Sequence, residues 1–211
     1  MNIQTGTISG RSKEVDSMST SVKPAVTVGL KSNPEALRNS FVEAMGRAAT
    51  GVTIVGTDGP SGRYAQTVSA MCSVTADPTT LLVCVNRKSP LNEAIVKHGV
   101  FSVSLLGRQH DHVADTFAGR PWPGKERWDF TCGEWAPLPS GCPTLVDALA
   151  SFDCILRQVV ECGTHYIYFG NVTAVGGQPG EPLTYHARTY GKPEPVEPSV
   201  FPDYPGSGPV R

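Results

Sequence analysis

The sequence predicts a mainly β fold, a small closed antiparallel barrel with peripheral helices. Six or seven short segments carry strand-like patterns, and turn clusters join most of them as in hairpins. Glycine (22 residues) and proline (18 residues) are both abundant, as a fold with many turns requires. The chain also lacks the βαβ rhythm and the G-x-G-x-x-G turn of a dinucleotide-binding parallel sheet. These three observations favour antiparallel strands closed into a barrel.

Composition limits both the size and the partners of the protein. At 211 residues the chain is long enough for one well-buried domain. Hydrophobic residues make up 39%, charged residues 18%, and the net charge is −1, so we expect no nucleic acid and no membrane as partner. No apolar run approaches the length of a membrane span, and residues 1–31 hold no apolar core of a secretory signal. We therefore expect a cytoplasmic protein.

The chain divides into three regions by composition. Residues 1–32 are rich in Ser, Thr, Gly and Lys without a sustained period, which predicts a flexible N-terminal arm. Residues 33–190 carry the strand and helix patterns and form the predicted barrel domain. Residues 191–211 are rich in proline and predict an extended C-terminal tail.

The six cysteines could be free thiols, form disulfide bonds or bind zinc. A disulfide framework is compatible with an even number, but a chain of this size does not need one and no export signal is present. A zinc site is conceivable, but its spacing matches no common template. That site would use Cys132, Cys142, Cys162 and His165. We expect reduced thiols and no metal.

The segments can be placed on the chain from their periods and end signals. A helix over about 34–49 is indicated by Asn33 as cap, Pro34 in the first turn and an apolar stripe that we expect to cover one end of the sheet. A second helix begins at Pro90 and stops at Gly99, and a third covers 108–118. Strands are expected at 52–57, 64–75, 81–85, 100–106, 148–162, 166–175 and 182–186, with an irregular, tryptophan-rich segment at 119–144.

The strand expected at 64–75 is unusual, because one of its faces is a row of short hydroxyls. Val68, Ala70, Cys72 and Val74 alternate with Thr and Ser residues and one methionine, Met71, a period that predicts one apolar and one polar face. Short hydroxyls beside exposed backbone suit a flat polar ligand that must come close. The alternative is an edge strand whose Ser/Thr face only meets water.

Seven short motifs occur in an order that resembles the flavin reductase-like, FMN-binding split-barrel family. The resemblance covers about residues 34–190, and its motifs are specific for the family rather than for a substrate. In chain order they are Ala49-Thr50-Gly51-Val52-Thr53-Ile54-Val55, Thr67-Val68-Ser69-Ala70 with Ser73-Val74, Asp77-Pro78, Leu81-Leu82-Val83-Cys84-Val85, Phe117-Ala118-Gly119, Gly163 with His165, and Pro182-Leu183 with Tyr185-His186.

This resemblance implies a split antiparallel barrel that works as a homodimeric NAD(P)H:flavin oxidoreductase. FMN or FAD would be the flavin and NADH or NADPH the hydride donor. The reduced flavin would serve a separate flavin-dependent monooxygenase acting on an aromatic compound. Two other functions stay open: an FMN-dependent nitro- or quinone-type reductase, which the tryptophan-rich segment favours, and a non-catalytic flavin-binding module.

The resemblance also assigns site residues. The positions that match flavin contacts are Arg63, Tyr64, Ala65, Gln66, Thr67, Ser69 and Ala70. The positions on the phosphate side are Cys84, Val85, Asn86, Ser89, Pro90 and Leu91, where a helix that starts at Pro90 directs free N–H groups towards an anion. Thr116 and Phe117 match a further contact near the dimer interface. Ser89 has an alternative role as a helix cap, and Phe117 as a core residue.

His165 is the one catalytic residue that the resemblance implies. It follows Gly163-Thr164 at a hairpin turn, where the family usually carries Gly-Asp-His. An acidic neighbour favours the protonated imidazole, so the threonine leaves the charge of His165 less constrained. We expect His165 to position the nicotinamide and to support the developing charge.

Overall fold

The computed structural model describes residues 33–120, 123–124 and 126–196, so the predicted arm at 1–32, Trp122 and most of the predicted tail lie outside the described residues. The chain separates into two compact units, residues 1–41 and 42–211. The first is described only from residue 33 and consists of most of helix α1 (Pro34–Met45). Among the described residues, no helix combines the length and the apolar character needed to cross a membrane.

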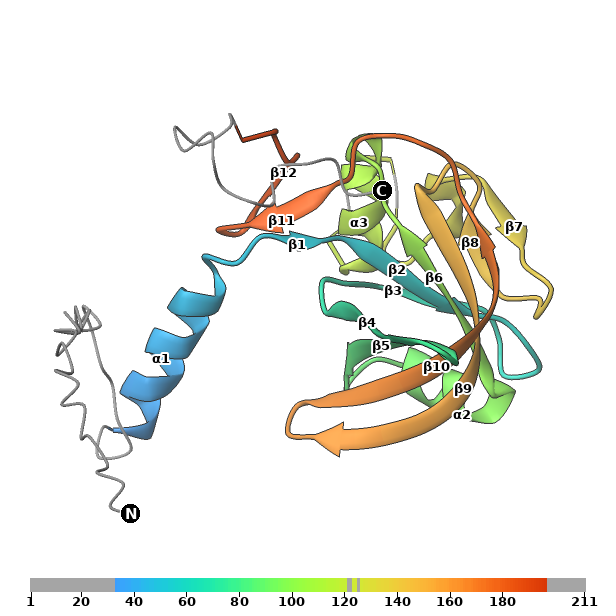
Figure 1. Cartoon of the computed structure of the whole chain (residues 1–211), viewed down its shortest axis with the longest axis horizontal. Coiled ribbons are helices and arrows are strands. Elements are labelled where there is room, and N and C mark those ends of the chain that lie inside the picture. Colours follow the sequence, from blue (N-terminus) through green and yellow to red (C-terminus); the bar gives the residue numbers. More distant parts are fainter. Residues whose placement is uncertain (1–32, 121–122, 125, 197–211) are drawn as a thin grey trace, which may run out of the picture. The chain divides into compact units, whose positions relative to one another are not determined.

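A seven-stranded antiparallel sheet forms the second unit and confirms the predicted barrel class (Figure 1). In spatial order its strands are β3 (Tyr64–Val68), β2 (Thr53–Thr57), β6 (Val100–Leu105), β9 (Ala150–Cys162), β10 (His165–Gly176), β5 (Thr79–Asn86) and β4 (Met71–Ala76). Small sheets join β1 (Thr50–Gly51), β11 (Thr184–His186) and β12 (Thr189–Gly191), and β7 (Trp135–Pro137) with β8 (Pro143–Leu145). The remaining helices are α2 (Leu91–His98), α3 (Asp111–Phe117) and two 3₁₀ turns, η1 (Arg108–His110) and η2 (Phe130–Cys132).

The predicted hairpin at 148–162 and 166–175 is confirmed as the long pair β9 and β10. Two register shifts interrupt this pair, one of them between Phe169 and Gly170. A Cβ atom at Gly170 would lie 2.5 Å from the Phe101 ring, so glycine is required for the barrel interior to close on this ring.

The prediction of one strand over 64–75 is wrong in one respect, because the chain forms two strands there. The chain leaves β3 at Ser69 and enters β4 at Met71, and these two strands lie at opposite edges of the sheet. The expected apolar face is correspondingly wrong after Val68, since Ala70, Cys72 and Val74 are exposed. Alternation alone cannot show that a strand is interrupted and that its second half borders solvent.

Smaller corrections concern the helices and the C-terminal strand. α1 ends at Met45 rather than near 49. The expectation that its apolar stripe covers one end of the sheet stays a prediction. The helix predicted at 108–118 is the turn η1 followed by α3. β12 was not predicted, because a three-residue strand carries too little pattern to be recognised.

Two hydrophobic clusters hold the sheet from its two faces. Every residue of β2 is buried, with Ile54 in one cluster and Val55 in the other, because successive side chains point to opposite faces. The first cluster lies with α3 and includes Phe117. The second lies with α2 and includes Leu91 and Tyr168.

Three aromatic rings extend the first cluster towards the surface. Phe117 is fully buried and contacts Phe130 edge-to-face at 5.0 Å and Trp135 at 5.4 Å, and Phe130 and Trp135 are 5.1 Å apart. The Trp135 indole N–H donates to the Phe130 carbonyl at 2.8 Å. This aromatic triad, Phe117–Phe130–Trp135, fixes the irregular segment after residue 126 onto α3.

All six cysteines are free. Cys72 and Cys162 are exposed, and burial raises the pKa of the Cys154 thiol to about 12. In the described part of the chain no three His, Cys, Asp or Glu side chains gather closely enough to hold a metal ion, so the zinc arrangement considered from the sequence is not formed.

We expect Phe117→Ala to lower the free energy of unfolding by about 3–5 kcal/mol, because it opens a cavity beneath the aromatic triad. Denaturant titration of the far-UV circular dichroism measures this change. Phe41→Ala is the matched control, since Phe41 is 63% exposed, and it should shift stability by less than about 0.5 kcal/mol. Equal effects of the two substitutions would contradict the structural role of Phe117.

Candidate functional site

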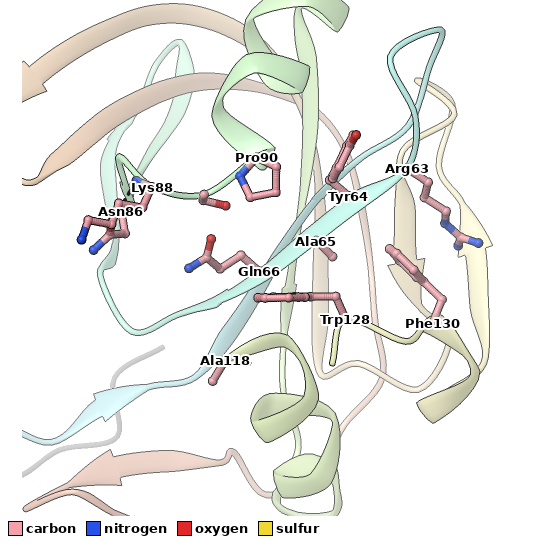
Figure 2. Close-up of a pocket in the computed structure, with 11 residues that line it drawn as sticks. Arg63, Tyr64, Ala65, Gln66, Asn86, Lys88, Pro90, Ala118, Trp128 and Phe130 are labelled. Carbon is pink, nitrogen blue, oxygen red and sulfur yellow. Dashed lines mark hydrogen bonds between the residues drawn. The ribbon is translucent and has the colours of Figure 1, made fainter. Parts of the chain in front are cut away.

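A cavity of about 560 Å³ lies between β3, the loop that joins β5 to α2, and the segment that follows α3 (Figure 2). A volume of this size is typical of a site for a cofactor-sized ligand. Its lining consists of Arg63, Tyr64, Ala65, Gln66, Asn86, Lys88, Ser89, Pro90, Ala118, Trp128 and Phe130. We call it the first cavity.

The structure brings together the two sequence-distant groups that were predicted as site residues. The first group is Tyr64, Ala65 and Gln66 on β3, with Arg63 directly before this strand. The second group is Asn86, the last residue of β5, with Ser89 and Pro90 in the β5–α2 loop. β3 and β5 are not neighbours in the sheet order, so only the curvature of the sheet places them around one cavity. Seven of the predicted site residues therefore line a common space.

The other predicted positions lie outside this lining. Ser69 and Ala70 are exposed where the chain crosses from β3 to β4, and Cys84 lies on β5 with its N–H donating to the Ala70 carbonyl at 3.0 Å. Val85 and Leu91 are fully buried in the second hydrophobic cluster. Their assignment to a ligand stays a prediction.

Three other predicted positions make hydrogen bonds or core contacts around α3: Thr67, Thr116 and Phe117. The Thr67 hydroxyl donates to the Ala114 carbonyl at 2.6 Å, and the Thr116 hydroxyl donates to the His112 carbonyl at 2.8 Å. Phe117 belongs to the aromatic triad, which is the core role that was weighed against a ligand contact. These residues position the wall of the first cavity rather than line it.

Lys88, Ala118, Trp128 and Phe130 line the cavity but were not among the predicted site residues. The sequence held a partial signal for two of them, since Lys88 adds charge near the phosphate positions and Trp128 belongs to the tryptophan-rich segment. Ala118 belongs to the Phe117-Ala118-Gly119 motif but was not assigned to the site, and Phe130 carried no signal, because its position depends on how the segment after α3 folds back.

Trp128 is held over the cavity by its backbone (Figure 2). Its N–H donates to the Thr116 carbonyl at 3.1 Å, just after the last turn of α3. Its φ angle of 56° lies in the left-handed region, which is uncommon for a bulky residue and is maintained only when the surroundings impose it. The side chain is 52% exposed, so a large flat ring borders the cavity without belonging to the core.

The electrostatics of the first cavity favour an anion. Arg63 and Lys88 line it, and no carboxylate occurs among the described residues of its lining. Arg63 lies over the Phe130 ring, with 4.2 Å between the guanidinium carbon and the ring centroid, and its Nε is 3.8 Å from Asp58. Lys88 makes no ion pair among the residues that the structure describes.

The backbone of the β5–α2 loop uses most of its donors internally. The Lys88 N–H donates to Asn86 Oδ1 at 3.0 Å, and the Ser89 N–H donates to the Asn86 carbonyl at 3.0 Å. Ser89 Oγ accepts from the Leu91 N–H at 3.3 Å, and α2 begins at Leu91, one residue later than expected, with Pro90 as its N-cap residue. An anion here would depend on side-chain cations more than on the helix terminus.

His165 does not line the first cavity but lies beside it. In the sheet register it is opposite Asn86, and the Thr164 carbonyl accepts the Arg87 N–H at 3.0 Å. The imidazole is half-buried, and its Nδ1 is 2.9 Å from the Thr164 hydroxyl. The β9–β10 turn is thereby fixed to the loop that forms one wall of the cavity.

The sequence of the chain matches known proteins over most of its length. The flavin reductase like domain matches residues 45–194, which lies largely within the predicted domain 33–190. The chain is 41% identical over 165 residues to the FMN reductase (NADH) RutF of Ancylobacter novellus, covering 77% of this chain and 88% of that protein.

Solved structures show the same fold. BorF, the flavin reductase component of a bacterial two-component tryptophan halogenase, is 30% identical with a TM-score of 0.65, covering 74% of this chain and 97% of BorF. A nitrilotriacetate monooxygenase component B from Mycobacterium thermoresistibile is 28% identical with a TM-score of 0.69, covering 80% of this chain and 95% of that one. The order of motifs, the split barrel and these matches lead to one conclusion: the chain belongs to the flavin reductase-like domain family.

Proposed function

We propose that this flavin reductase oxidises NADH, reduces a flavin in the first cavity and releases the reduced flavin to a separate monooxygenase. The observation that carries the proposal is the lining of the cavity, where flat apolar walls, two amide side chains and two cations meet. The relative RutF is named an FMN reductase (NADH), and a structural relative is a monooxygenase component. These names support NADH as donor and a monooxygenase as partner.

The residues of the first cavity fit a flat ring system with an anionic end. When bound, the flavin accepts a hydride equivalent from the reduced nicotinamide and carries two electrons. Ala65 has a small side chain, so it lets a ring approach β3 closely, while Tyr64 and Trp128 offer flat surfaces. Gln66 and Asn86 each carry amide donors and acceptors that suit the polar edge of such a ring.

Lys88 is the group that we assign to the flavin phosphate. The neighbouring backbone donors are already used, and Lys88 has no carboxylate partner among the described residues, so its charge is available to an anion. Arg63 adds a second cation to the lining. The phosphate would also keep the polar end of the flavin at the β5–α2 loop and the ring towards Trp128.

His165 is assigned to the nicotinamide. Hydride transfer needs the nicotinamide held close to the flavin ring, and a small misplacement is costly. The Arg87 N–H donates to the Thr164 carbonyl, and His165 is paired with Asn86, which lines the cavity, so the backbone of the β9–β10 turn is fixed next to the β5–α2 loop. An imidazole can donate to a carboxamide or support developing charge in either protonation state.

A second function is favoured by one observation, the exposed ring of Trp128 over the cavity. A flat ring at that place also suits an aromatic acceptor, as in an FMN-dependent nitro- or quinone-type reductase. We rank it second, because one structural relative is named the flavin reductase component of a two-component halogenase and another a monooxygenase component B. The cytoplasm is the compartment we propose, supported by the six free cysteines.

One assay separates these functions. The purified protein is followed for NADH and NADPH oxidation with free FMN, FAD or riboflavin, and separately with a nitroarene. Turnover that needs added flavin, faster with NADH, is the expected result. Turnover only with the nitroarene would favour the second function, and binding of flavin without any turnover would indicate a non-catalytic module.

We expect Lys88→Ala to raise the Kd for FMN roughly tenfold, about 1.4 kcal/mol, because the phosphate loses its cation. Riboflavin has no phosphate, so its Kd should change by less than about twofold. Calorimetric titration of both flavins measures the difference. Lys192→Ala is the matched control, since Lys192 is also exposed but pairs with Glu181 outside the cavity. Equal losses for FMN and riboflavin would remove Lys88 from the phosphate.

We expect His165→Ala to slow flavin reduction by NADH at least tenfold, equivalent to about 1.4 kcal/mol of barrier, while the Kd for FMN stays near that of the wild type. Stopped-flow traces of flavin bleaching at saturating NADH provide the rate. His186→Ala serves as the control, because His186 is exposed on β11. A wild-type rate in the His165 variant would end this assignment.

A homodimer is part of the proposal, and an exposed apolar surface supports it. Val74 and Val175 are 47% and 67% exposed, and both border a depression of about 340 Å³ that also includes Met71, Leu81 and Phe152. Apolar side chains grouped in this way at the β4 edge of a sheet are a surface that a second copy can bury.

Light scattering should therefore give roughly twice the chain mass of 22.4 kDa at micromolar concentration. Val74→Glu places a charge in the depression and should shift the mass towards the monomer, whereas Val146→Glu, at an exposed valine elsewhere, should not. A wild-type protein with the mass of a monomer would contradict the proposal.

A further inference from the structure

We propose that His98 is a positioning residue for the flavin site. It is the last residue of α2 and does not line the first cavity. From outside the cavity its imidazole holds residues 58–62, which we call the β2–β3 turn, and this turn leads directly into Arg63, one of the two cations of the lining. The inference rests on the proposed function, because it names a residue that orders one wall of the flavin site.

Both ring nitrogens of His98 make hydrogen bonds. The Thr57 hydroxyl donates its one proton to the Val100 carbonyl at 2.8 Å, so at 3.0 Å it accepts from the Nδ1–H of His98. The other ring nitrogen, Nε2, accepts the Ser61 N–H at 3.1 Å and therefore carries no proton. The neutral imidazole joins the end of β2 to the β2–β3 turn.

The β2–β3 turn also packs against the imidazole ring. A Cβ atom at Gly59 would lie 2.7 Å from Cδ2 of His98, so the backbone approaches the ring as closely as only glycine allows. Within the turn, the Gly62 N–H donates to the Gly59 carbonyl at 2.9 Å, and the φ angle of Gly62 is 102°, which glycine adopts without strain. The turn is therefore compact, and His98 fixes it to the end of α2.

Arg63 relies on this turn for its position. Its guanidinium carbon lies 4.2 Å from the centroid of the Phe130 ring, at the wall of the first cavity. Its Nε is 3.8 Å from Asp58 at the other end of the turn, and these two side chains are 39% and 42% exposed. A long and exposed ion pair stabilises little. The place of the guanidinium therefore depends on the backbone that His98 holds.

Lys88 provides an internal comparison, because it is the other cation of the first cavity. Figure 2 shows Lys88 and Arg63 at opposite sides of the cavity. The loop that carries Lys88 is fixed by the Asn92 amide group, which donates to the backbone carbonyls of residues 86 and 89 at 2.8 and 2.9 Å. Loss of the His98 imidazole should therefore displace one cation and leave the other in place.

The test is a set of double-mutant cycles in the full-length protein, with calorimetry giving the Kd for FMN. His98→Ala and Arg63→Ala should each raise this Kd roughly fivefold, a factor typical of one lost hydrogen bond. Because His98 acts through Arg63, the variant with both substitutions should bind FMN only as weakly as Arg63→Ala alone. In a Lys88→Ala background, His98→Ala should add its full factor. A role of His98 in stability alone would weaken binding equally in both backgrounds.

Gly59→Ala separates the turn from the ring by a second route and keeps the imidazole. Its methyl group would meet His98 at 2.7 Å, so ring and turn must move apart, and the Kd for FMN should rise as in His98→Ala. Gly176→Ala is the matched control, because a Cβ atom there would have no neighbour within 4 Å. Gly59→Ala keeps the test valid if His98→Ala lowers the melting temperature.

Three results would overturn the inference. One is an equal further loss of affinity from His98→Ala in the Arg63→Ala and Lys88→Ala backgrounds. Another is a wild-type Kd in both His98→Ala and Gly59→Ala. The third is a wild-type Kd in Arg63→Ala, since that cation would then need no positioning, while a weakened Lys88→Ala would still support the proposed function. A wild-type protein that binds no FMN would instead overturn the proposed function.

Discussion

Closure of the sheet is the constraint on which the rest of this structure depends. β3 and β4 follow one another in the chain but lie at opposite edges of the seven strands, so the chain crosses from edge to edge at Ser69 and Ala70. The Ala70 carbonyl then accepts the Cys84 N–H, which holds the crossing against β5. Because the edges approach each other, residues 63–66 and 86–90 face one space, and the first cavity follows from this approach.

The remaining wall of that cavity depends on aromatic packing instead of backbone pairing. The segment after α3 has little regular structure, so the aromatic triad holds it in place through edge-to-face contacts between 5.0 and 5.4 Å. Phe130 is fixed by these contacts, and the Arg63 guanidinium lies over its ring. Rigid walls suit a site that must present a ring to a second reactant at a short distance.

The β5–α2 loop connects the site to the other parts of the barrel. Asn92 on α2 fixes the loop from below, and the Arg87 N–H ties it to the β9–β10 turn that carries His165. One loop therefore lines the first cavity and also holds the β9–β10 turn and α2 in place.

Local patterns in the sequence determined the β class, the β9–β10 hairpin and α2, and the family resemblance singled out two groups of residues that line the first cavity. These features depend on short-range periods, turn residues and caps, which neighbouring residues decide. The sequence alone could not reveal the break between β3 and β4, since exposure of Ala70 depends on sheet closure and not on alternation. It also could not place Trp128 in the first cavity, because an irregular segment has no period to read, and for Phe117 it left the core role and a ligand contact as alternatives. Tertiary structure decided these points, because contacts between residues far apart in the chain are set by the packing of the whole barrel.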